Sequence, residues 1–525
     1  MPPPSRIAAR ILSRRVPLPP HLDPSALFAA LTDEGRTPGS CLLESADRNA
    51  RAGLRSLLFP EPLLRLTADR TTIRVRALGH RGLPLLLPLA ARVPGAVVQA
   101  GCLEAPTPRS HPHPGLDDRE RLGSPSALDA VRALLHLVED THPEADLPIL
   151  VAGALAFELV DHFEALPPRP PAPFQEDDLD LVLVADSLVV DHARSEIIIT
   201  TRALMGEGLD GDPEARSAEH RLDRFAAAIP EACRTRAPDA EPPTLDSLPA
   251  AVNAQDPLFE DGVRRVLDHI QAGDVFQCVL SRTIEVESAA PSMAVYRQLR
   301  RHDPSPYLFH FDMARGSLLG ASPETCVAVH DRMVSLSPIA GTAPRGSTPQ
   351  VDRRWEIGLR LDAKEQAEHA MLVDLARNDV ARIAVPGTRR VEEALQIARF
   401  RHVQHLVTRV VGVLHPDLDA LDAYRASANM GTLTGAPKLR ATEIIRGLED
   451  TARGYYGGAM GYVTARGDMD TCIVIRSLRH REGRYTVRAG AGVVRDSDPA
   501  RELAETTSKA STPLLAVLLA EETTQ

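Results

Sequence analysis

Short β-branched runs alternate with amphipathic helical patterns along this chain of 525 residues, and this mixture constrains the fold most strongly. The strand-like runs are residues 181–185, 197–200, 278–286 and 317–322. The clearest helix is predicted over 257–272, where apolar residues recur at spacings of four and three between Pro257 and Gly273. Further helices are expected near 362–377 and 499–520. The two periods together predict a mixed α+β fold.

A Pro- and acid-rich stretch at 237–249 divides the chain unevenly and is typical of a linker. We expect an N-terminal region over 1–250 and a second region over 251–520, intertwined in one globular unit. Two further loops are expected at 104–124 and 165–177, because proline and charged residues there show no apolar period.

Composition excludes several classes of protein. The net charge is −11, from 60 basic and 71 acidic residues, so a general nucleic-acid coat is not expected. Six cysteines without a CxxC pair indicate reduced thiols in a cytoplasm rather than a zinc site or a disulfide framework. No apolar run reaches the ~18 residues of a membrane span. The first 22 residues are basic and acid-free, which we interpret as an ordinary strand in preference to a transit peptide.

Two glycine-rich segments resemble phosphate-binding loops only superficially. The segment 431–438 (GTLTGAPK) lacks the Gly-Lys-Ser/Thr ending of a P-loop, and 489–494 (AGAGVV) lacks the third glycine of a dinucleotide fingerprint. Each remains open as a tight turn or as a loop whose amides approach an anion.

Charged residues on two predicted helices also allow two interpretations. Glu368 falls on the apolar stripe of its helix, where a carboxylate is costly unless Lys364 or a metal ion neutralises it. Glu502, Glu505 and Lys509 follow one face of the last helix. They form either an exposed ion pair or a second acidic and cationic group facing a site.

Arg476 lies in a β-branched run that predicts a strand, and a buried arginine there needs a ligand or protein carboxylate. His402 and His405 stand three apart, as on one helix face. For such a pair, a core or surface position is favoured over metal ligation.

Seven sequence motifs, taken together and in their order along the chain, carry more information than any of the residues above alone. They are SPIAGTAPRG (337–346), LVDLARNDVAR (372–382), HVQHLVTRVVG (402–412), MGTLTGAPKLRA (430–441), GYYGGAMGY (454–462), DTCIVIRS (470–477) and AGAGVVRDSDP (489–499) with ETTSKA (505–510). The set resembles the chorismate-utilising enzymes, and within them the large subunits (component I) of tryptophan-sensitive bacterial anthranilate synthases. A thinner resemblance reaches LLESADRNA at 42–50.

This resemblance implies a sandwich of antiparallel sheets with outer helices and a central cleft. It implies that chorismate and ammonia become anthranilate and pyruvate, the first committed step of tryptophan biosynthesis, with Mg²⁺ and without an organic cofactor. Aminodeoxyisochorismate synthase and aminodeoxychorismate synthase are the alternative activities. The 251–520 region would carry catalysis, and 1–250 would carry elements that bind tryptophan.

The resemblance also implies roles for individual residues. Glu324 matches the general acid, His405 the histidine of the elimination step, and Thr432 a nearby catalytic contact. Glu368 and Glu505 match the metal ligands. The substrate-binding positions are Gly341, Thr342, Tyr456, Arg476, Gly490, Ala491, Gly492 and Lys509. The positions of the inhibitory tryptophan pocket are Ser45, Arg55, Pro306, Tyr307 and Leu308.

Two positions favour ammonia over other nucleophiles. Gln277 stands where the water-adding relatives have a lysine base, and Ala340 stands where many aminodeoxychorismate synthases have a lysine. The chain also lacks a glutaminase-like Gly-x-Cys-x-Gly segment. A separate glutamine amidotransferase subunit is therefore expected, in a heterotetramer of two large and two small subunits.

Overall fold

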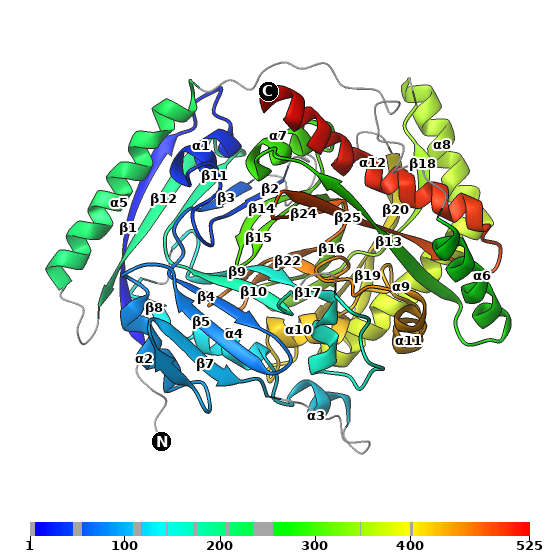
Figure 1. Ribbon diagram of the computed structural model, residues 1–525, viewed down its shortest axis with the longest axis horizontal. Coiled ribbons are helices and arrows are strands. Elements are labelled where there is room, and N and C mark those ends of the chain that lie inside the picture. The colour runs from blue at the N-terminus through cyan, green and yellow to red at the C-terminus, as the bar shows by residue number, and fades with distance from the viewer. Residues whose placement is uncertain are drawn as a thin grey trace.

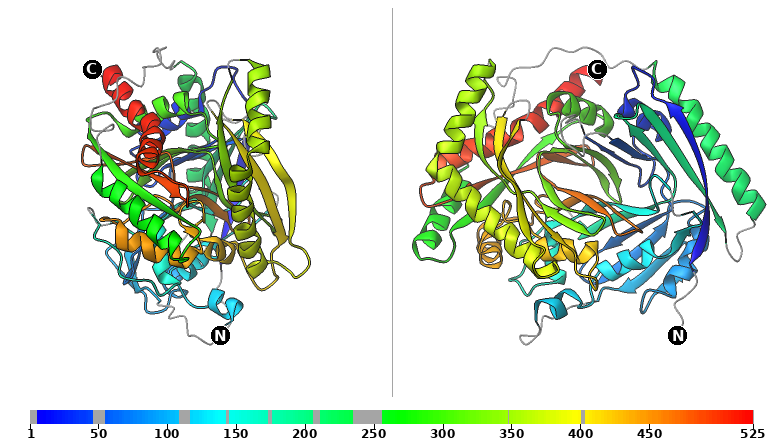
Figure 2. Two further views of the ribbon diagram at one scale, coloured as in Figure 1. Left: turned by 90° about the vertical axis from the view of Figure 1, so that its right-hand side faces the viewer. Right: turned by 180° about the vertical axis from the view of Figure 1, so that it is seen from behind.

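The computed structural model describes residues 6–45, 55–108, 117–142, 145–172, 176–205, 211–234, 256–346, 348–399 and 403–524. In these ranges two large sheets form the centre of the molecule and helices surround them (Figures 1 and 2). The linker predicted at 237–249 lies outside the described residues.

The first sheet has 12 strands. In spatial order they are β21 (Gly435–Ala436), β13 (Gln277–Glu287), β25 (Arg484–Val493), β24 (Ser477–Arg481), β15 (Gly316–Ser322), β14 (Tyr307–Met313), β2 (Cys41–Glu44), β3 (Arg55–Phe59), β11 (Ser187–Asp191), β12 (Glu196–Met205), β1 (Ile7–Pro17) and β8 (Val138–Asp140). The basic N-terminal segment is thus the strand β1, and Arg15 on it pairs with Glu196 at 2.8 Å.

The second sheet has 13 strands. They are β18 (Ile339–Pro344), β20 (Val403–Val413), β17 (Met333–Leu336), β16 (Thr325–His330), β23 (Met469–Ile473), β22 (Ala459–Thr464), β9 (Leu150–Leu155), β10 (Leu179–Val184), β4 (Leu64–Ala68), β5 (Thr72–Ala77), β7 (Cys102–Pro106) and β6 (Val97–Gln99), with β19 (Arg390–Arg399) paired to β20. Among the described strand pairs, only β1 with β8 is parallel.

The helices cover the outer faces of both sheets. They are α1 (Pro24–Leu31), α2 (Leu86–Ala90), α3 (Asp118–Leu122), α4 (Leu128–Leu135), α5 (Gly211–Ala232), α6 (Pro257–Gln271), α7 (Ser292–His302), α8 (Pro349–Leu361), α9 (Ala363–Ile383), α10 (Ala420–Ser427), α11 (Lys438–Leu448) and α12 (Pro499–Thr524), with short 3₁₀ turns at Leu83–Leu85 and Phe157–His162. No helix in the described ranges is long and apolar enough to cross a bilayer.

The sheets pack face to face through a shared apolar layer. Phe309 and Phe311 of the first sheet belong to the same buried cluster as Ala152 and Met460 of the second sheet. Separate clusters lie under α1, α7 and α12 on one outer face, and under α4, α9 and α10 on the other. The expected mixed α+β sandwich of antiparallel sheets is confirmed.

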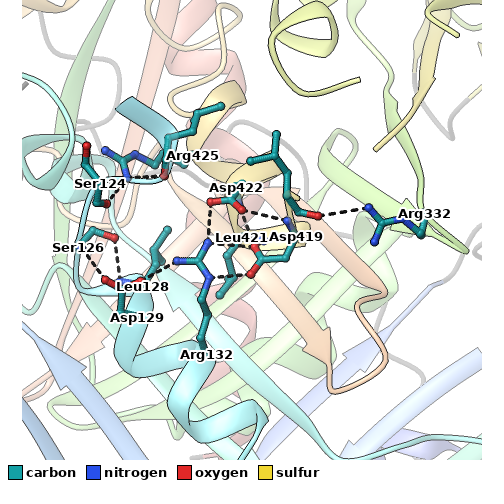
Figure 3. A network of polar contacts seen from close by, with 12 residues as sticks. Ser124, Ser126, Leu128, Asp129, Arg132, Arg332, Asp419, Leu421, Asp422 and Arg425 are labelled. Atoms are coloured by element: carbon teal, nitrogen blue, oxygen red, sulfur yellow. Dashed lines mark hydrogen bonds and ion pairs between the residues drawn. The ribbon is translucent and has the colours of Figure 1, made fainter. Parts of the chain in front are cut away.

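The two halves of the chain contribute to both sheets. Strand β2 pairs with β14, and β9 pairs with β22. A polar network also ties α4 to α10, where Arg132 contacts Asp419 and Asp422 at 2.6 Å each (Figure 3). The loop expected at 104–124 is partly regular, because β7 ends at Pro106 and α3 occupies Asp118–Leu122.

Candidate active site

The strand ends and helices beside the sheet interface bring the predicted catalytic and substrate residues into one region. Lys509 on α12 acts electrostatically on both Glu324 and His405, and Arg476 acts on His405. The Tyr456 hydroxyl lies 2.7 Å from where a Cβ on Gly490 would stand. Residues separated by more than 180 positions in sequence therefore meet in one site.

Glu324 occupies the short turn between β15 and β16. The residue is 6% exposed, and its Oε1 has no hydrogen-bond partner among the described residues. Burial raises the pKa of Glu324 to about 8, against the opposing effects of Thr432 and Lys509. A carboxyl group with this pKa carries its proton at neutral pH, as a general acid must. Thr432, whose hydroxyl is also buried and unpartnered in the described part of the chain, lies beside it.

His405 lies on strand β20, so the helix expected around HVQH is wrong; His402 falls outside the described residues. Alternate residues along β20 are buried, which is the period of a strand. The Nδ1 atom of His405 is 2.8 Å from the carbonyl oxygen of Gly341. Because a carbonyl only accepts, Nδ1 carries the hydrogen and Nε2 carries the lone pair. Burial lowers the pKa of His405, which keeps the ring neutral.

Arg476 lies between β23 and β24 and not within a strand, which corrects the expectation from its β-branched neighbours. Its φ of 50° is in the left-handed region, which is strained for a residue with a side chain. Burial lowers the pKa of Arg476, against attraction from Asp303. A guanidinium held in this strained, desolvated position suits an anionic ligand.

Gly490, Ala491 and Gly492 lie on β25, opposite 279–281 of β13. A Cβ on Gly490 would come within 2.7 Å of the Leu280 carbonyl oxygen and of the Tyr456 hydroxyl. The Lys509 ammonium donates to the Gly490 carbonyl at 2.9 Å. Glycine is therefore required here by close packing of backbone and side chains.

Gly341 and Thr342 lie on β18, where a bulge shifts the register against β20 and places Thr342 opposite His405. Gly341 has a φ of 71°, and a Cβ on it would stand 3.0 Å from Glu365 Oε2. The segment at Gly341 therefore contacts the His405 ring on one side and Glu365 of α9 on the other.

The structure adds one carboxylate that the sequence analysis did not consider, Glu365, which stands three residues before Glu368 on α9. Glu502, already noted on the face of the last helix, stands three residues before Glu505 on α12. Burial is the main cause that raises the pKa values of Glu365, Glu368 and Glu502, and neighbouring carboxylates add smaller contributions in the same direction. The repeated three-residue spacing was the signal in the sequence that could have revealed this acidic cluster.

The acidic cluster has the donor chemistry that a hard divalent cation requires. Four carboxylates offer only oxygen ligands, and their mutual repulsion favours a bound cation. In the described part of the chain, no three of them bring one oxygen each within 4.8 Å of one another. Instead Lys509 pairs with Glu505 at 2.7 Å and Lys364 with Glu368 at 3.7 Å. Both ion pairs considered from the sequence thus exist beside the site.

Gln277 begins β13 at the other side of the glycine strand. Its Oε1 is buried without a partner among the described residues, and its Nε2 is 2.6 Å from where a Cβ on Gly492 would stand. An amide oxygen here accepts hydrogen bonds but cannot serve as a strong base. Ala340 lies on β18 beside Gly341.

The residues predicted to bind tryptophan line a second cavity of about 460 Å³. They are Ser45, Arg55, Pro306, Tyr307 and Leu308. The Ser45 hydroxyl is buried without a partner in the described ranges, and Arg55 pairs with Asp191 at 3.1 Å. The lining also includes Glu44, Arg194 and Asp470, so charged groups and the unpartnered Ser45 hydroxyl share this cavity with apolar side chains.

A further cavity of about 520 Å³ lies between α6, β13 and the loop at 448–456. Of the predicted site residues it includes only Tyr456. Its many charges are largely paired internally, as in the contacts of Glu449 with Arg453 and Arg488 at 2.6 and 2.7 Å.

Comparison with known proteins agrees with this geometry. Residues 106–515 match the model of the chorismate binding enzyme family. The chain is 40% identical to anthranilate synthase component 1 of Vibrio cholerae over 96% of each chain. It is 42% identical to the pyocyanine-specific anthranilate synthase component 1 of Pseudomonas aeruginosa, over 91% of this chain and 90% of the relative.

A solved structure shows the same architecture. Anthranilate synthase component I from Streptococcus pneumoniae superposes with a TM-score of 0.66 at 29% identity. The match covers 89% of this chain and 93% of that one.

Proposed function

This chain belongs to the chorismate binding enzyme family, and we propose that it is the chorismate-converting large subunit, component 1, of an anthranilate synthase. The reaction is chorismate plus ammonia giving anthranilate, pyruvate and water. The observation that carries the proposal is that Glu324, whose pKa burial raises to about 8, and His405, whose pKa burial lowers, both lie within the electrostatic influence of Lys509.

The first chemical step needs a proton for the departing hydroxyl on C4 of chorismate. Glu324 supplies it, because its raised pKa keeps the carboxyl protonated near neutral pH. Ammonia attacks C2 with its lone pair as the ring double bonds shift and water leaves. Gln277 is suited to this nucleophile, because its amide oxygen can accept a hydrogen bond from an N–H group of ammonia. The amide is too weak a base to deprotonate water.

The second step removes the C2 proton and breaks the C3–O bond, which releases pyruvate and makes the ring aromatic. His405 is placed as the base, because Gly341 fixes its tautomer and leaves the lone pair on Nε2. Arg476 and Tyr456 hold the enolpyruvyl carboxylate, while the glycine strand at 490–492 permits close approach of the substrate.

Mg²⁺ fits the acidic cluster by ligand chemistry, and Glu368 and Glu505 are its proposed ligands, with Glu365 and Glu502 beside them. A Mg²⁺ ion held there would neutralise the cluster and supply positive charge for the ring carboxylate of chorismate. Lys509 contacts the Gly490 carbonyl, which keeps α12 against β25.

The relatives are named component 1, and this chain has no glutaminase-like cysteine segment. We therefore assign it a glutamine amidotransferase partner that supplies ammonia, in a cytoplasmic heterotetramer of two large and two small subunits. Nucleic acid and membranes have no part in this assignment.

The 460 Å³ cavity is the proposed site of feedback inhibition by L-tryptophan. Arg55 suits the amino-acid carboxylate, and the apolar wall with Pro306 and Leu308 suits an indole ring. The similarity to a pyocyanine-specific enzyme favours a second candidate, in which the same chemistry serves a dedicated secondary pathway. Inhibition by tryptophan distinguishes the two.

The test uses the purified chain with chorismate, Mg²⁺ and ammonium at alkaline pH, and follows anthranilate fluorescence and pyruvate. Fluorescence that tryptophan suppresses supports the tryptophan-pathway enzyme. Fluorescence that ignores tryptophan supports the secondary pathway. An amino product without pyruvate would replace the proposal with an aminodeoxyisochorismate or aminodeoxychorismate synthase.

A further inference from the structure

Tyr307 belongs to the 460 Å³ cavity, but its hydroxyl is bonded to residues outside the predicted tryptophan set. It donates to Asp470 Oδ1 at 3.0 Å and lies 2.9 Å from the Thr325 hydroxyl. Because its single hydrogen goes to Asp470, the Thr325 hydroxyl must donate to the Tyr307 oxygen. The three side chains form one directed chain of hydrogen bonds.

This chain of hydrogen bonds ends beside the general acid. Thr325 follows Glu324 directly, at the point where β16 begins. The Glu324 carbonyl accepts from the Ile473 amide at 3.0 Å, and its amide donates to the Ser322 hydroxyl at 3.3 Å. The backbone of Glu324 is thus held from both sides, while its carboxyl oxygen Oε1 is unpartnered among the described residues.

The pairing of β16 with β23 is irregular at this place. Thr325 pairs with Cys472, a residue of the cavity wall, and the register then shifts between Thr325 and Val327. Bulges re-aim side chains and often lie next to active sites. Tyr307 and Cys472 therefore both contact Thr325 at the strand end where this irregularity begins.

We propose that Thr325 is a positioning residue that links occupancy of the tryptophan cavity to the orientation of Glu324, through the hydroxyl of Tyr307 anchored on Asp470. This inference rests on the proposed function and explains how binding of the inhibitor changes the position of the catalytic acid. A ligand that displaces Tyr307 breaks or strains the bond to Thr325 and turns the Glu324 carboxyl away from its substrate position.

The proposal can be measured as the thermodynamic coupling between tryptophan binding and chorismate binding. If tryptophan weakens chorismate binding by some factor, chorismate must weaken tryptophan binding by the same factor. That factor is about 5- to 150-fold in typical allosteric proteins. It is read from the tryptophan dissociation constant, measured by calorimetry with Mg²⁺, with and without saturating chorismate and in the absence of ammonia and glutamine.

The decisive variant is Thr325→Val, which keeps the branched shape and removes the hydroxyl. We expect its coupling factor to fall to within about 2-fold of unity, while the tryptophan affinity without chorismate changes by no more than about 10-fold, the loss of one hydrogen bond. Thr325→Ser retains the donor and should restore the coupling.

Thr471→Val is the matched control. Thr471 lies on β23, donates to the Val327 carbonyl at 2.7 Å and accepts from the Val327 amide at 3.2 Å, so its hydrogen bonds tie the same two strands. We expect this variant to keep the coupling of the wild-type protein. Equal loss of coupling in both valine variants would show a general effect of loosening the strands and overturn the proposal.

Other outcomes are equally clear. Undiminished coupling in Thr325→Val, or loss of tryptophan binding in it, would each overturn the link. Wild-type protein that forms anthranilate but binds tryptophan and chorismate independently would overturn the inference and leave the function intact. Wild-type protein that forms no anthranilate would overturn the proposed function itself.

Discussion

The ammonium of Lys509 lies 2.7 Å from the carboxylate of Glu505 and at the same time donates to the Gly490 carbonyl. One side chain on α12 thereby connects the acidic cluster to β25, the strand proposed to bind the substrate. Its charge also lowers the pKa of Glu324, which burial raises to about 8.

This relationship predicts the pH dependence of the enzyme. In the proposed mechanism Glu324 acts only while protonated, so kcat/KM for chorismate at a constant concentration of free ammonia should fall as pH rises through about 8. Lys509→Met removes the charge that favours the carboxylate and should move this limb to higher pH. Stopped assays across pH 6.5–10 measure both profiles, and an unmoved or lowered limb in Lys509→Met would contradict the assignment.

Glu324→Gln separates catalysis from stability. We expect kcat to fall by about 10²- to 10⁴-fold, because the amide cannot donate an acidic proton. The pKa of Glu324 is about 8 in the folded state and 4.5 in the unfolded state. Between about pH 4.5 and 8 the folded state therefore binds more protons than the unfolded state, and the free energy of unfolding falls as pH rises through this range. Glutamine does not ionise, so the variant does not lose this stability. Its Tm should exceed that of the wild-type protein above pH 8, and a lower Tm there would refute the buried-acid account.

His405→Gln should divide the two chemical steps. Ammonia addition proceeds without the imidazole, whereas elimination loses its base and slows by about 10²- to 10⁴-fold. Chromatography should therefore show an amino intermediate that accumulates while pyruvate release, coupled to lactate dehydrogenase, lags behind. If chorismate consumption and pyruvate release decline together, His405 has another role.

Helix ends with capping residues, and strands with β-branched runs, could be predicted from the sequence because their causes are local. Asp256 caps α6, Pro257 opens it, and Gly273 follows its end with a φ of 81°. The predicted helix at 257–272 is confirmed within one residue. The β-branched runs at 181–185 and 278–286 likewise coincide with β10 and β13.

The errors arise where distant contacts decide the conformation. The short spacing between His402 and His405 fits a helix, but pairing with β18 and β19 makes this segment a strand. Arg476 lies outside a strand because the chain passes there from β23 in one sheet to β24 in the other. Local periodicity predicts neither the strand pairing at His405 nor this crossing between sheets.

The acidic cluster shows the same limit. The three-residue spacing places Glu365 beside Glu368 and Glu502 beside Glu505 within each helix, but no local pattern predicts that α9 and α12 bring the two pairs together. The residues of the tryptophan cavity, by contrast, were placed through family resemblance rather than through any property of the segments themselves.

Gly490→Ala tests the close packing at the substrate strand. The added methyl group would meet the Leu280 carbonyl and the Tyr456 hydroxyl at 2.7 Å, so the strand or the tyrosine must move. We expect kcat/KM for chorismate to fall at least about 100-fold, the cost of a displacement of about 1 Å in a positioned site. Gly447→Ala on α11 is the control, because a Cβ there meets nothing within 4 Å. Similar losses in both variants would indicate a general disturbance.

The metal assignment predicts a graded response to Mg²⁺. Chelation should abolish anthranilate formation, and Glu368→Gln should raise the Mg²⁺ concentration for half-maximal activity by at least about 100-fold, more than the 10- to 100-fold typical of residues that only support a ligand. Glu365→Gln should give that smaller increase. The surface variant Asp417→Asn, away from the cluster, should leave the requirement unchanged. An unchanged requirement in Glu368→Gln would remove it from the metal site.

In the proposed reaction this chain joins ammonia to the ring of chorismate and expels pyruvate. The most direct measurement supplies ¹⁵N-ammonium and chorismate with Mg²⁺ and quantifies the products by mass spectrometry. We expect one ¹⁵N-labelled anthranilate and one pyruvate for each chorismate consumed. A hydroxylated product without ¹⁵N, or a ¹⁵N-labelled product that retains the enolpyruvyl group, would contradict it.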